Sequence, residues 1–322
     1  MTPPQTPRPA VVWFALVVVY LVWGSTYLAI RVIVESTPPL IAMGARFLTA
    51  GAILAGVLAL RHGPSVLRVS PRQLGSAALV GALLLLGGNG GVAVAEQTVP
   101  SGLAALLVAA VPLWLVCLRV LAGDRPRART VAGTVLGFLG IAVLARPGGH
   151  ADGADPVHFW GVLVVLGATV SWAVGSFFSS RMPMPANAFV ATAWEMLAGG
   201  LGLVLAGAAG GELDGLQLGD VPGEAWAWLG YLVVVGSLAA FSAYVWLLHN
   251  APISLTATYA YVNPVVAVFL GALVLSEPVT GAILLGGAVV VLGVGLVVST
   301  ERPRRLRPPV QPVDAMPASR VG

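Results

Sequence analysis

Residues 252–278, PISLTATYAYVNPVVAVFLGALVLSEP, set out the plan of this 322-residue chain, because an earlier stretch repeats it. Residues 100–126 read PSGLAALLVAAVPLWLVCLRVLAGDRP and have the same design. Each stretch opens on a proline, runs through small and hydroxylated residues to a second proline twelve positions on, and ends at a polar turn with a third. Because the second prolines, Pro112 and Pro264, are separated by the same 152 positions as the first, we interpret the pair as a duplication.

The correspondence extends beyond these stretches in both directions. Upstream it is weaker, and downstream it continues one position out of step with the prolines. Two halves are therefore expected, with the division near residues 150–155. The corresponding pairs are Trp23 and Trp172, Leu48 and Leu197, Gly51 and Gly200, Gly133 and Gly286, and Gly140 and Gly293.

The composition is that of an integral membrane protein. Hydrophobic residues make up 57% of the chain and charged residues 9%, and the mean hydropathy is +0.91. The chain has no lysine, which excludes the lysine-bearing phosphate loop of ATP-driven enzymes. Cys117 is the only cysteine and the four histidines show no ligand spacing, so we expect no disulfide, no metal and no cofactor. The basic residues form no continuous face, so nucleic acid is not expected as a partner.

Apolar runs predict an all-α integral membrane fold with ten transmembrane helices, since about 20 apolar residues cross the hydrocarbon layer. Residues 11–147 and 157–299 form the two five-helix repeats, joined by a linker at 148–156. The first run is interpreted as a span and not as a removed signal peptide. The tails, residues 1–10 and 300–322, are expected to be cytoplasmic, and the second to be disordered. The expected spans are 11–34, 38–60, 73–95, 99–121, 130–146, 157–180, 187–208, 225–248, 253–275 and 280–299.

The distribution of the 17 arginines predicts the orientation in the membrane. With the N-terminus cytoplasmic, 14 arginines fall on the inner side and two on the outer side, while Arg46 lies within a span. Both termini are then cytoplasmic in a multi-pass protein of the plasma membrane. Because each repeat has five spans, the second enters from the opposite side, and the halves form an inverted repeat.

Pro112 and Pro264 are expected to lie near the middle of the membrane. A proline inside a helix leaves the carbonyl four residues earlier without its donor, here those of Val108 and Ala260. Such groups are tolerated at this depth only where protein or water covers them. Both prolines therefore predict a central cavity lined by the fourth and ninth spans.

Taken together, these features resemble the drug/metabolite transporter superfamily, specifically its EamA-type members. The resemblance covers residues 11–299 and includes the Trp-Gly-Ser motif at 23–25 and the Leu-Ser-Glu-Pro turn at 275–278. In the first half this turn reads Gly-Asp-Arg-Pro, with Asp124 one position before the place of Glu277, which puts a shared role for the two turns in doubt. The resemblance implies secondary transport of small metabolites, most often export, through a cavity built from spans one, three, four, six, eight and nine.

Two charged residues lie clearly inside spans, where an uncompensated charge costs several kcal/mol. Arg46 and Glu195 fall at equivalent positions of the two repeats and are candidate gating or coupling residues. The alternatives are that Arg46 reaches the headgroups and that Glu195 forms a structural ion pair with Arg181 or a neighbouring residue. Glu96, at the end of the third span, is expected to be a solvated loop residue.

Aromatic and polar residues gather in the spans that should line the cavity, as a site for amphipathic solutes requires. Asn89 interrupts the third span within Gly-Gly-Asn-Gly-Gly, where the alternative is close packing of small residues. The glycines of the fifth and tenth spans predict close helix contacts, either within one chain or across a homodimer. The candidate substrate-binding residues are Trp23, Ser25, Asn89, Pro112, Trp172, Ser176, Tyr244, Tyr259, Asn263 and Pro264.

The sequence thus favours a secondary transporter that exports a small metabolite, an amino acid or similar amphipathic solute, by alternating access. Uptake and uncoupled facilitation of another solute class stay open as alternatives. A membrane-embedded enzyme would need His, Asp or Cys groups gathered at one depth, and the sequence does not show this pattern. A scaffold or sensor would not require the duplicated prolines. The identity of the solute is left open.

Overall fold

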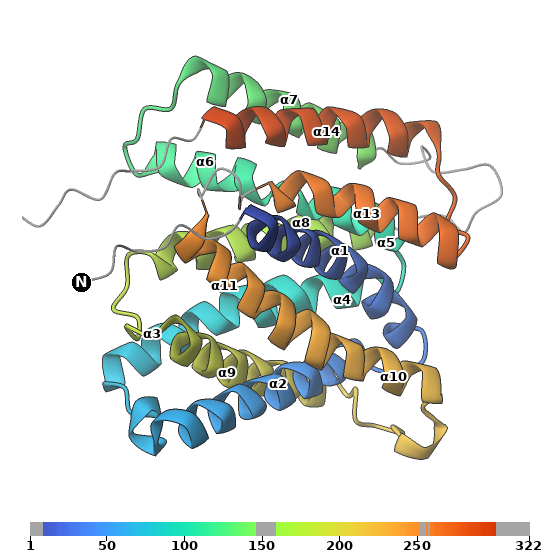
Figure 1. Ribbon diagram of the computed structural model, residues 1–322. Coiled ribbons are helices and arrows are strands. Elements are labelled where there is room, and N and C mark those ends of the chain that lie inside the picture. Colours follow the sequence, from blue (N-terminus) through green and yellow to red (C-terminus); the bar gives the residue numbers. More distant parts are fainter. Residues whose placement is uncertain (1–8, 146–158, 252–255, 257, 301–322) are drawn as a thin grey trace, which may run out of the picture.

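The computed structural model describes residues 9–145, 159–251, 256 and 258–300, and every regular element in them is a helix (Figure 1). The expectations for the linker 148–156, most of both tails, and the proline that opens the stretch at 252 lie outside these residues. The described residues form a bundle of long helices that run roughly side by side (Figure 1).

The first half contains five helical segments, two of them divided. The third segment passes through a π-helix, η2, and the fourth is broken into α5 and α6. The elements are α1 (Pro9–Val34), α2 (Pro39–His62), the 3-10 turn η1 (Pro64–Leu67), α3 (Pro71–Gly81), η2 (Ala82–Gly90), α4 (Gly91–Ala95), α5 (Ser101–Val108), α6 (Val111–Leu121) and α7 (Ala128–Leu144).

The second half repeats this order, and its third segment also contains a π-helix, η4. The elements are α8 (Phe159–Ser179), α9 (Ala188–Ala209), the 3-10 turn η3 (Leu218–Asp220), α10 (Gly223–Tyr231), η4 (Leu232–Ala239), α11 (Ala240–Asn250), α13 (Tyr259–Val274) and α14 (Gly281–Thr300).

Eight of the described helical segments are long and apolar enough to span a membrane. The other two apolar helices, α7 and α13, have 17 and 16 residues and stand where the fifth and ninth spans are expected. The described residues are therefore all-helical, and the chain is a multi-pass membrane protein.

Local sequence signals set several helix starts. Proline stands at the first helical position of α2 and α3, where its missing N–H costs nothing. Ser70 and Gln73 form a reciprocal capping box at the start of α3, with distances of 3.3 Å and 2.9 Å. The Asn187 side chain accepts from the first backbone amides of α9.

Pro112 and Pro264, the two prolines expected near the middle of the membrane, act differently. Pro112 is the second residue of α6, and the helix is interrupted between Val108 and Val111. By contrast, α13 runs unbroken through Pro264, which is its sixth residue and therefore affects only the carbonyls of the first turn. Pro264 is buried and Pro112 half-buried, so neither is exposed on the bundle surface.

Helices α2 and α9 pack through pairs of contacts in which equivalent residues of the two halves trade places. A Cβ added at Gly200 would lie 2.8 Å from the amide nitrogen of Leu48, and one added at Gly51 would lie 3.1 Å from Cγ of Leu197. Since residues 48 and 51 correspond to 197 and 200 in the repeat, each contact is the counterpart of the other. The two helices lie together along one edge of the bundle (Figure 1).

Helices α7 and α14 form the opposite edge in the same way (Figure 1). A Cβ at Gly133 would lie 2.9 Å from the carbonyl oxygen of Gly293, and one at Gly286 would lie 3.2 Å from that of Gly140. These contacts are again counterparts in the repeat. The sequence left open whether these glycines make close helix contacts within one chain or across a homodimer. In the structure they pack against each other within one chain.

Candidate functional site

Three aromatic rings from both halves of the chain meet near the centre of the sequence-predicted site. Trp23 of α1 lies 5.0 Å from Tyr244 of α11 and 5.2 Å from Tyr259 of α13, measured between ring centroids, and the two tyrosines lie 5.6 Å apart. Two of the three contacts are edge-to-face, a favourable geometry for aromatic pairs. We call Trp23, Tyr244 and Tyr259 the aromatic cluster.

Polar groups at the edge of the aromatic cluster are fixed by backbone carbonyls. The indole Nε1 of Trp23 donates to the carbonyl oxygen of Gly236 in η4 at 3.3 Å. With its amide oriented to satisfy both bonds, buried Asn263 donates to the carbonyl oxygens of Tyr20 and Tyr259 at 3.3 Å and 3.2 Å. The hydroxyl of Ser25 meets that of Tyr231 at 2.6 Å. The cluster therefore has a rigid polar rim, which is typical of sites that orient a solute.

Arg46 reaches the same π-helix from α2. Its Nε donates to the hydroxyl of Ser237 at 3.0 Å, and an added Cβ at Gly236 would lie 3.5 Å from its Nη2. The residue is only 5% exposed, so the interpretation that it reaches the headgroups is wrong. Its guanidinium also stacks on Phe47, with Cζ 4.6 Å from the ring centroid. Trp23 and Arg46 thus contact successive residues of η4.

No carboxylate of the described residues lies within ion-pair distance of the Arg46 guanidinium. A buried cation that is held only by neutral groups has an unfavourable desolvation energy that an anion would offset. The structure therefore leaves a positive charge beside the aromatic cluster that a negatively charged solute group can balance.

The other predicted residues form a second group on the π-helix of the first half. The ring of Trp172 lies against Gly88 of η2, where an added Cβ would be 2.8 Å from its Cε3. The neighbouring Ser171 hydroxyl donates to the carbonyl oxygen of Leu83 at 2.8 Å. Asn89 lies next to Gly88 and is half-buried. Trp172 therefore packs against the third span of the first half as Trp23 packs against the third span of the second half.

Three further predicted residues contribute less. Ser176 is half-buried in α8, and its backbone carbonyl accepts a hydrogen bond from the Ser179 hydroxyl at 3.0 Å. Pro112 and Pro264 shape the helices that carry the site, Pro112 through the break between α5 and α6. They act on backbone geometry and offer no side-chain donor or acceptor.

Glu195 is half-buried in α9, and Gly81 of α3 packs directly on its backbone carbonyl. The alternative of an ion pair with Arg181 is wrong for the described arrangement. Arg181 instead donates to the carbonyl of Phe177 at 2.8 Å and stacks on its ring at 3.5 Å. Glu195 therefore has no cationic partner within ion-pair distance among the described residues.

The turn glutamate of the second half stabilises the start of α5. The Glu277 carboxylate accepts from the Ser101 amide at 2.7 Å, the Ser101 hydroxyl at 3.0 Å and the Gly102 amide at 3.1 Å. A negative charge at a helix N-terminus is favourable. Asp124, the acidic residue of the first-half turn, pairs instead with Arg119 at 2.9 Å on the surface. The two turns have different contacts, in line with their different sequences.

Glu96 is the functional candidate that the sequence misplaced. Its side chain is 0% exposed, so the expectation of a solvated loop residue is wrong. The loop after α4 packs against α1 and α8. Arg31 of α1 donates to the Glu96 carbonyl, and Gly161 of α8 packs against Thr98 and Val99. The hydropathy of the chain could not predict the burial of Glu96, because this burial depends on contacts between segments that are distant in the sequence.

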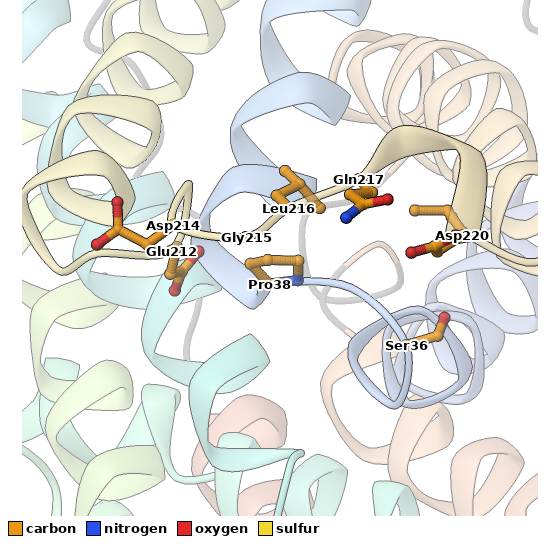
Figure 2. A pocket seen from close by; sticks show the side chains of 9 residues that line it. Ser36, Pro38, Glu212, Asp214, Gly215, Leu216, Gln217 and Asp220 are labelled. Atoms are coloured by element: carbon orange, nitrogen blue, oxygen red, sulfur yellow. The ribbon is translucent and has the colours of Figure 1, made fainter.

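A separate cavity of about 260 Å³ lies between the α1–α2 turn and the loop that follows α9 (Figure 2). Glu212, Asp214 and Asp220 give it an acidic lining, and Glu212 also accepts from the first amides of α2, Leu40 at 3.3 Å and Ile41 at 2.9 Å. None of the predicted substrate residues lines this cavity. We interpret it as a surface feature created by the capping of α2.

The sequence of the chain is similar to those of known transporters. The EamA-like transporter family matches the chain twice, at residues 10–146 and 159–299. The chain is 42% identical over 302 residues to the uncharacterized inner membrane transporter YedA of Escherichia coli strain K12, a match that covers 93% of this chain and 94% of that protein. It is 28% identical over 288 residues to a probable terminal-alkyne amino-acid exporter of Streptantibioticus cattleyicolor, covering 89% and 92% of the two chains.

A solved crystal structure shares the fold. Its TM-score is 0.60 at 23% sequence identity, and the match covers 90% of this chain and 96% of that chain. The matched family covers both halves of the chain, in agreement with the repeated helix order and the exchanged helix contacts. This chain belongs to the EamA-like transporter family.

Proposed function

We propose that this protein is a secondary transporter that exports a small amphipathic solute, an amino acid or a similar molecule, by alternating access. It does so with ten spans in two inverted five-helix repeats, residues 11–147 and 157–299, in the plasma membrane. Both termini are cytoplasmic, and the end of the bundle where α1 terminates is extracellular, as the arginine distribution predicts. The family and the relatives named above support transport, and the substrate and direction are our proposal.

One observation carries the substrate class: the aromatic cluster and the Arg46 guanidinium contact adjacent residues of η4. Trp23 bonds the carbonyl of Gly236, and Arg46 bonds the hydroxyl of Ser237. Aromatic walls suit an apolar body, while a guanidinium suits a carboxylate. A solute with both parts, such as an amino acid, fits this pairing. The name of the Streptantibioticus cattleyicolor relative supports the same class and the outward direction.

The repeated packing supports alternating access. Trp23 contacts η4 and Trp172 contacts η2, the π-helices in the third segments of the two halves, and π-helices recur at sites of function. In an inverted repeat, one half can adopt the conformation of the other, which closes one side of the site as the opposite side opens. Rocking about the helices that carry Pro112 and Pro264 then exposes the aromatic cluster to each side in turn.

Counterflow in proteoliposomes tests this function. Vesicles loaded with an unlabelled solute are given a trace of the same labelled solute, in a screen of amino acids, nucleosides, sugars and small cations. We expect exchange for a solute with an apolar body and a carboxylate. Arg46→Gln should reduce that exchange by about tenfold, the effect of losing one charged hydrogen bond of about 1.5 kcal/mol. Exchange of neutral sugars alone, or of no class at all, would refute the proposal.

Glu195 is proposed to couple transport to protons, because a carboxyl group inside a span can carry a proton across it. Glu195→Gln should remove the dependence of solute flux on an imposed pH gradient while leaving counterflow, which needs no gradient, within about threefold of the original rate. Glu224→Gln is the matched control, since Glu224 is exposed in the first turn of α10. A Glu195→Gln flux that still responds fully to the gradient rules the carboxylate out and leaves uncoupled facilitation.

A further inference from the structure

Glu96 carries a buried carboxyl group without a hydrogen-bond partner. It directly follows α4, outside the third helical span, and its side chain is 0% exposed. Among the described residues, it is the one whose buried side-chain oxygens, both Oε1 and Oε2, lack any partner. Buried polar groups are nearly always hydrogen-bonded, so this exception requires a physical explanation.

The neighbours of Glu96 do not supply a counter-charge. Arg31 of α1 is close, but its Nη1 donates to the Glu96 backbone carbonyl and its Nε pairs with Glu35 at 3.1 Å. Glu277 is also close enough to repel the carboxylate, and its own oxygens are occupied by the start of α5. Tyr27 of α1 completes the set of titratable and charged groups that face Glu96 from the described elements.

These surroundings favour the neutral acid. Burial is the largest effect and raises the pKa of Glu96 well above its ordinary value, and repulsion by Glu277 raises it further. The attraction of Arg31 acts in the opposite direction without cancelling the other two. A neutral carboxylic acid also avoids the much larger cost of an unpaired buried charge. The burial of both unpartnered oxygens therefore favours the protonated form of Glu96.

We propose that Glu96 is a proton-binding site that gates the end of the bundle at which the C-terminus of α1 lies. Glu96 keeps its proton while the loop after α4 is packed, and it releases the proton to water when that end opens. The gating role rests on the proposed alternating access, whereas the binding of the proton does not. Because the proton returns to the side from which it came, Glu96 sets the opening equilibrium and drives no net proton flux. This separates its role from that of Glu195.

The sign of the pH effect follows from linkage. In the open, hydrated form, the carboxyl group has an ordinary pKa of about 4.3. Between that value and the raised pKa of the closed form, the closed form binds one more proton, so a rise in pH favours opening. Below the ordinary value both forms are protonated, and pH no longer shifts the equilibrium.

Infrared spectroscopy of the purified full-length chain tests the proton site. A pH titration should show the carbonyl stretching band of a protonated carboxylic acid persisting well above the ordinary titration range of glutamate. In a Glu195→Gln background, which removes the other proposed proton-binding carboxyl group, Glu96→Gln should lack this band, whereas Glu224→Gln should retain it. Glu96→Met, which is apolar and of similar length, provides a second variant if the first is unstable. An unchanged band in both position-96 variants would overturn the proposal.

Cysteine labelling tests the gate. Val99, three residues along the same loop, is 0% exposed, so Val99→Cys in a Cys117→Ser background reports opening of this end. The rate of labelling by a charged maleimide is divided by the rate for an exposed cysteine placed at Glu224. This normalised rate should increase as the pH rises, by at most about tenfold per pH unit, which is the limit set by the release of one proton. In Glu96→Gln the normalised rate should stay at its low-pH value. A normalised rate that rises equally in Glu96→Gln overturns the gate, and neither assay depends on the transported solute.

Discussion

Replacing Trp23 with alanine is expected to reduce solute counterflow by about 30- to 100-fold. The substitution removes two aromatic contacts, with Tyr244 and Tyr259, and the hydrogen bond to the Gly236 carbonyl. Each aromatic pair contributes about 0.5–1.5 kcal/mol and the hydrogen bond a similar amount. A combined loss of about 2–2.7 kcal/mol in solute binding corresponds to that range. The initial rate of labelled-solute exchange in proteoliposomes measures it.

The same helix provides the matched control. Trp13 is 56% exposed on α1 and contacts none of the aromatic cluster. Trp13→Ala should therefore retain exchange within about twofold, since surface substitutions away from special features change free energies by about 0.5 kcal/mol or less. Equal exchange rates for the two alanine variants would show that the aromatic cluster does not contact the solute.

Replacing Gly293 with alanine is expected to cost about 3 kcal/mol of stability, the upper part of the usual range for overpacking. The added Cβ would lie 2.5 Å from the amide nitrogen of Gly137 and 2.7 Å from the carbonyl oxygen of Gly133. Both are backbone atoms, so no side chain can move aside, and α7 and α14 must separate along their contact. The counterpart contact between Gly140 and Gly286 would then loosen as well.

Thermal unfolding in detergent measures this loss, and Gly295→Ala controls for the change of residue type. Gly295 lies two positions further along α14, and an added Cβ there would meet nothing within 4 Å. It should unfold within about 0.5 kcal/mol of the original chain, or slightly later because alanine favours helix. If both alanine variants unfold alike, the close approach of α7 and α14 does not exist in the membrane protein.

The features carried by the repeat could be predicted from sequence. Apolar run length locates helices because the bilayer imposes it, and a duplication shows equivalent residues in pairs. The correspondence of Gly133 and Gly140 with Gly286 and Gly293 therefore anticipated a close contact that the structure confirms between α7 and α14. The sequence did not decide between one chain and two, since periodicity identifies a face and not its partner.

Features that depend on long-range pairing could not be predicted. The bond from Arg46 to Ser237 joins residues 191 positions apart, and no local pattern identifies that hydroxyl as a partner. Glu96 follows an apolar helix and precedes polar residues, as exposed loop residues do, yet tertiary contacts bury it completely. Pro264 matches Pro112 in spacing, but its effect depends on where α13 begins, which the sequence did not define.

The most direct test of alternating access is the labelling of one cysteine from both sides of the membrane. Thr26 is half-buried beside Gly236, so Thr26→Cys in a Cys117→Ser chain reports on the site. A membrane-impermeant thiol reagent is added to intact cells and, separately, to inside-out vesicles. The proposed transporter predicts labelling from each side, slowed in both cases by a solute that exchanges in counterflow. Labelling from one side only, whatever solute is present, would contradict it.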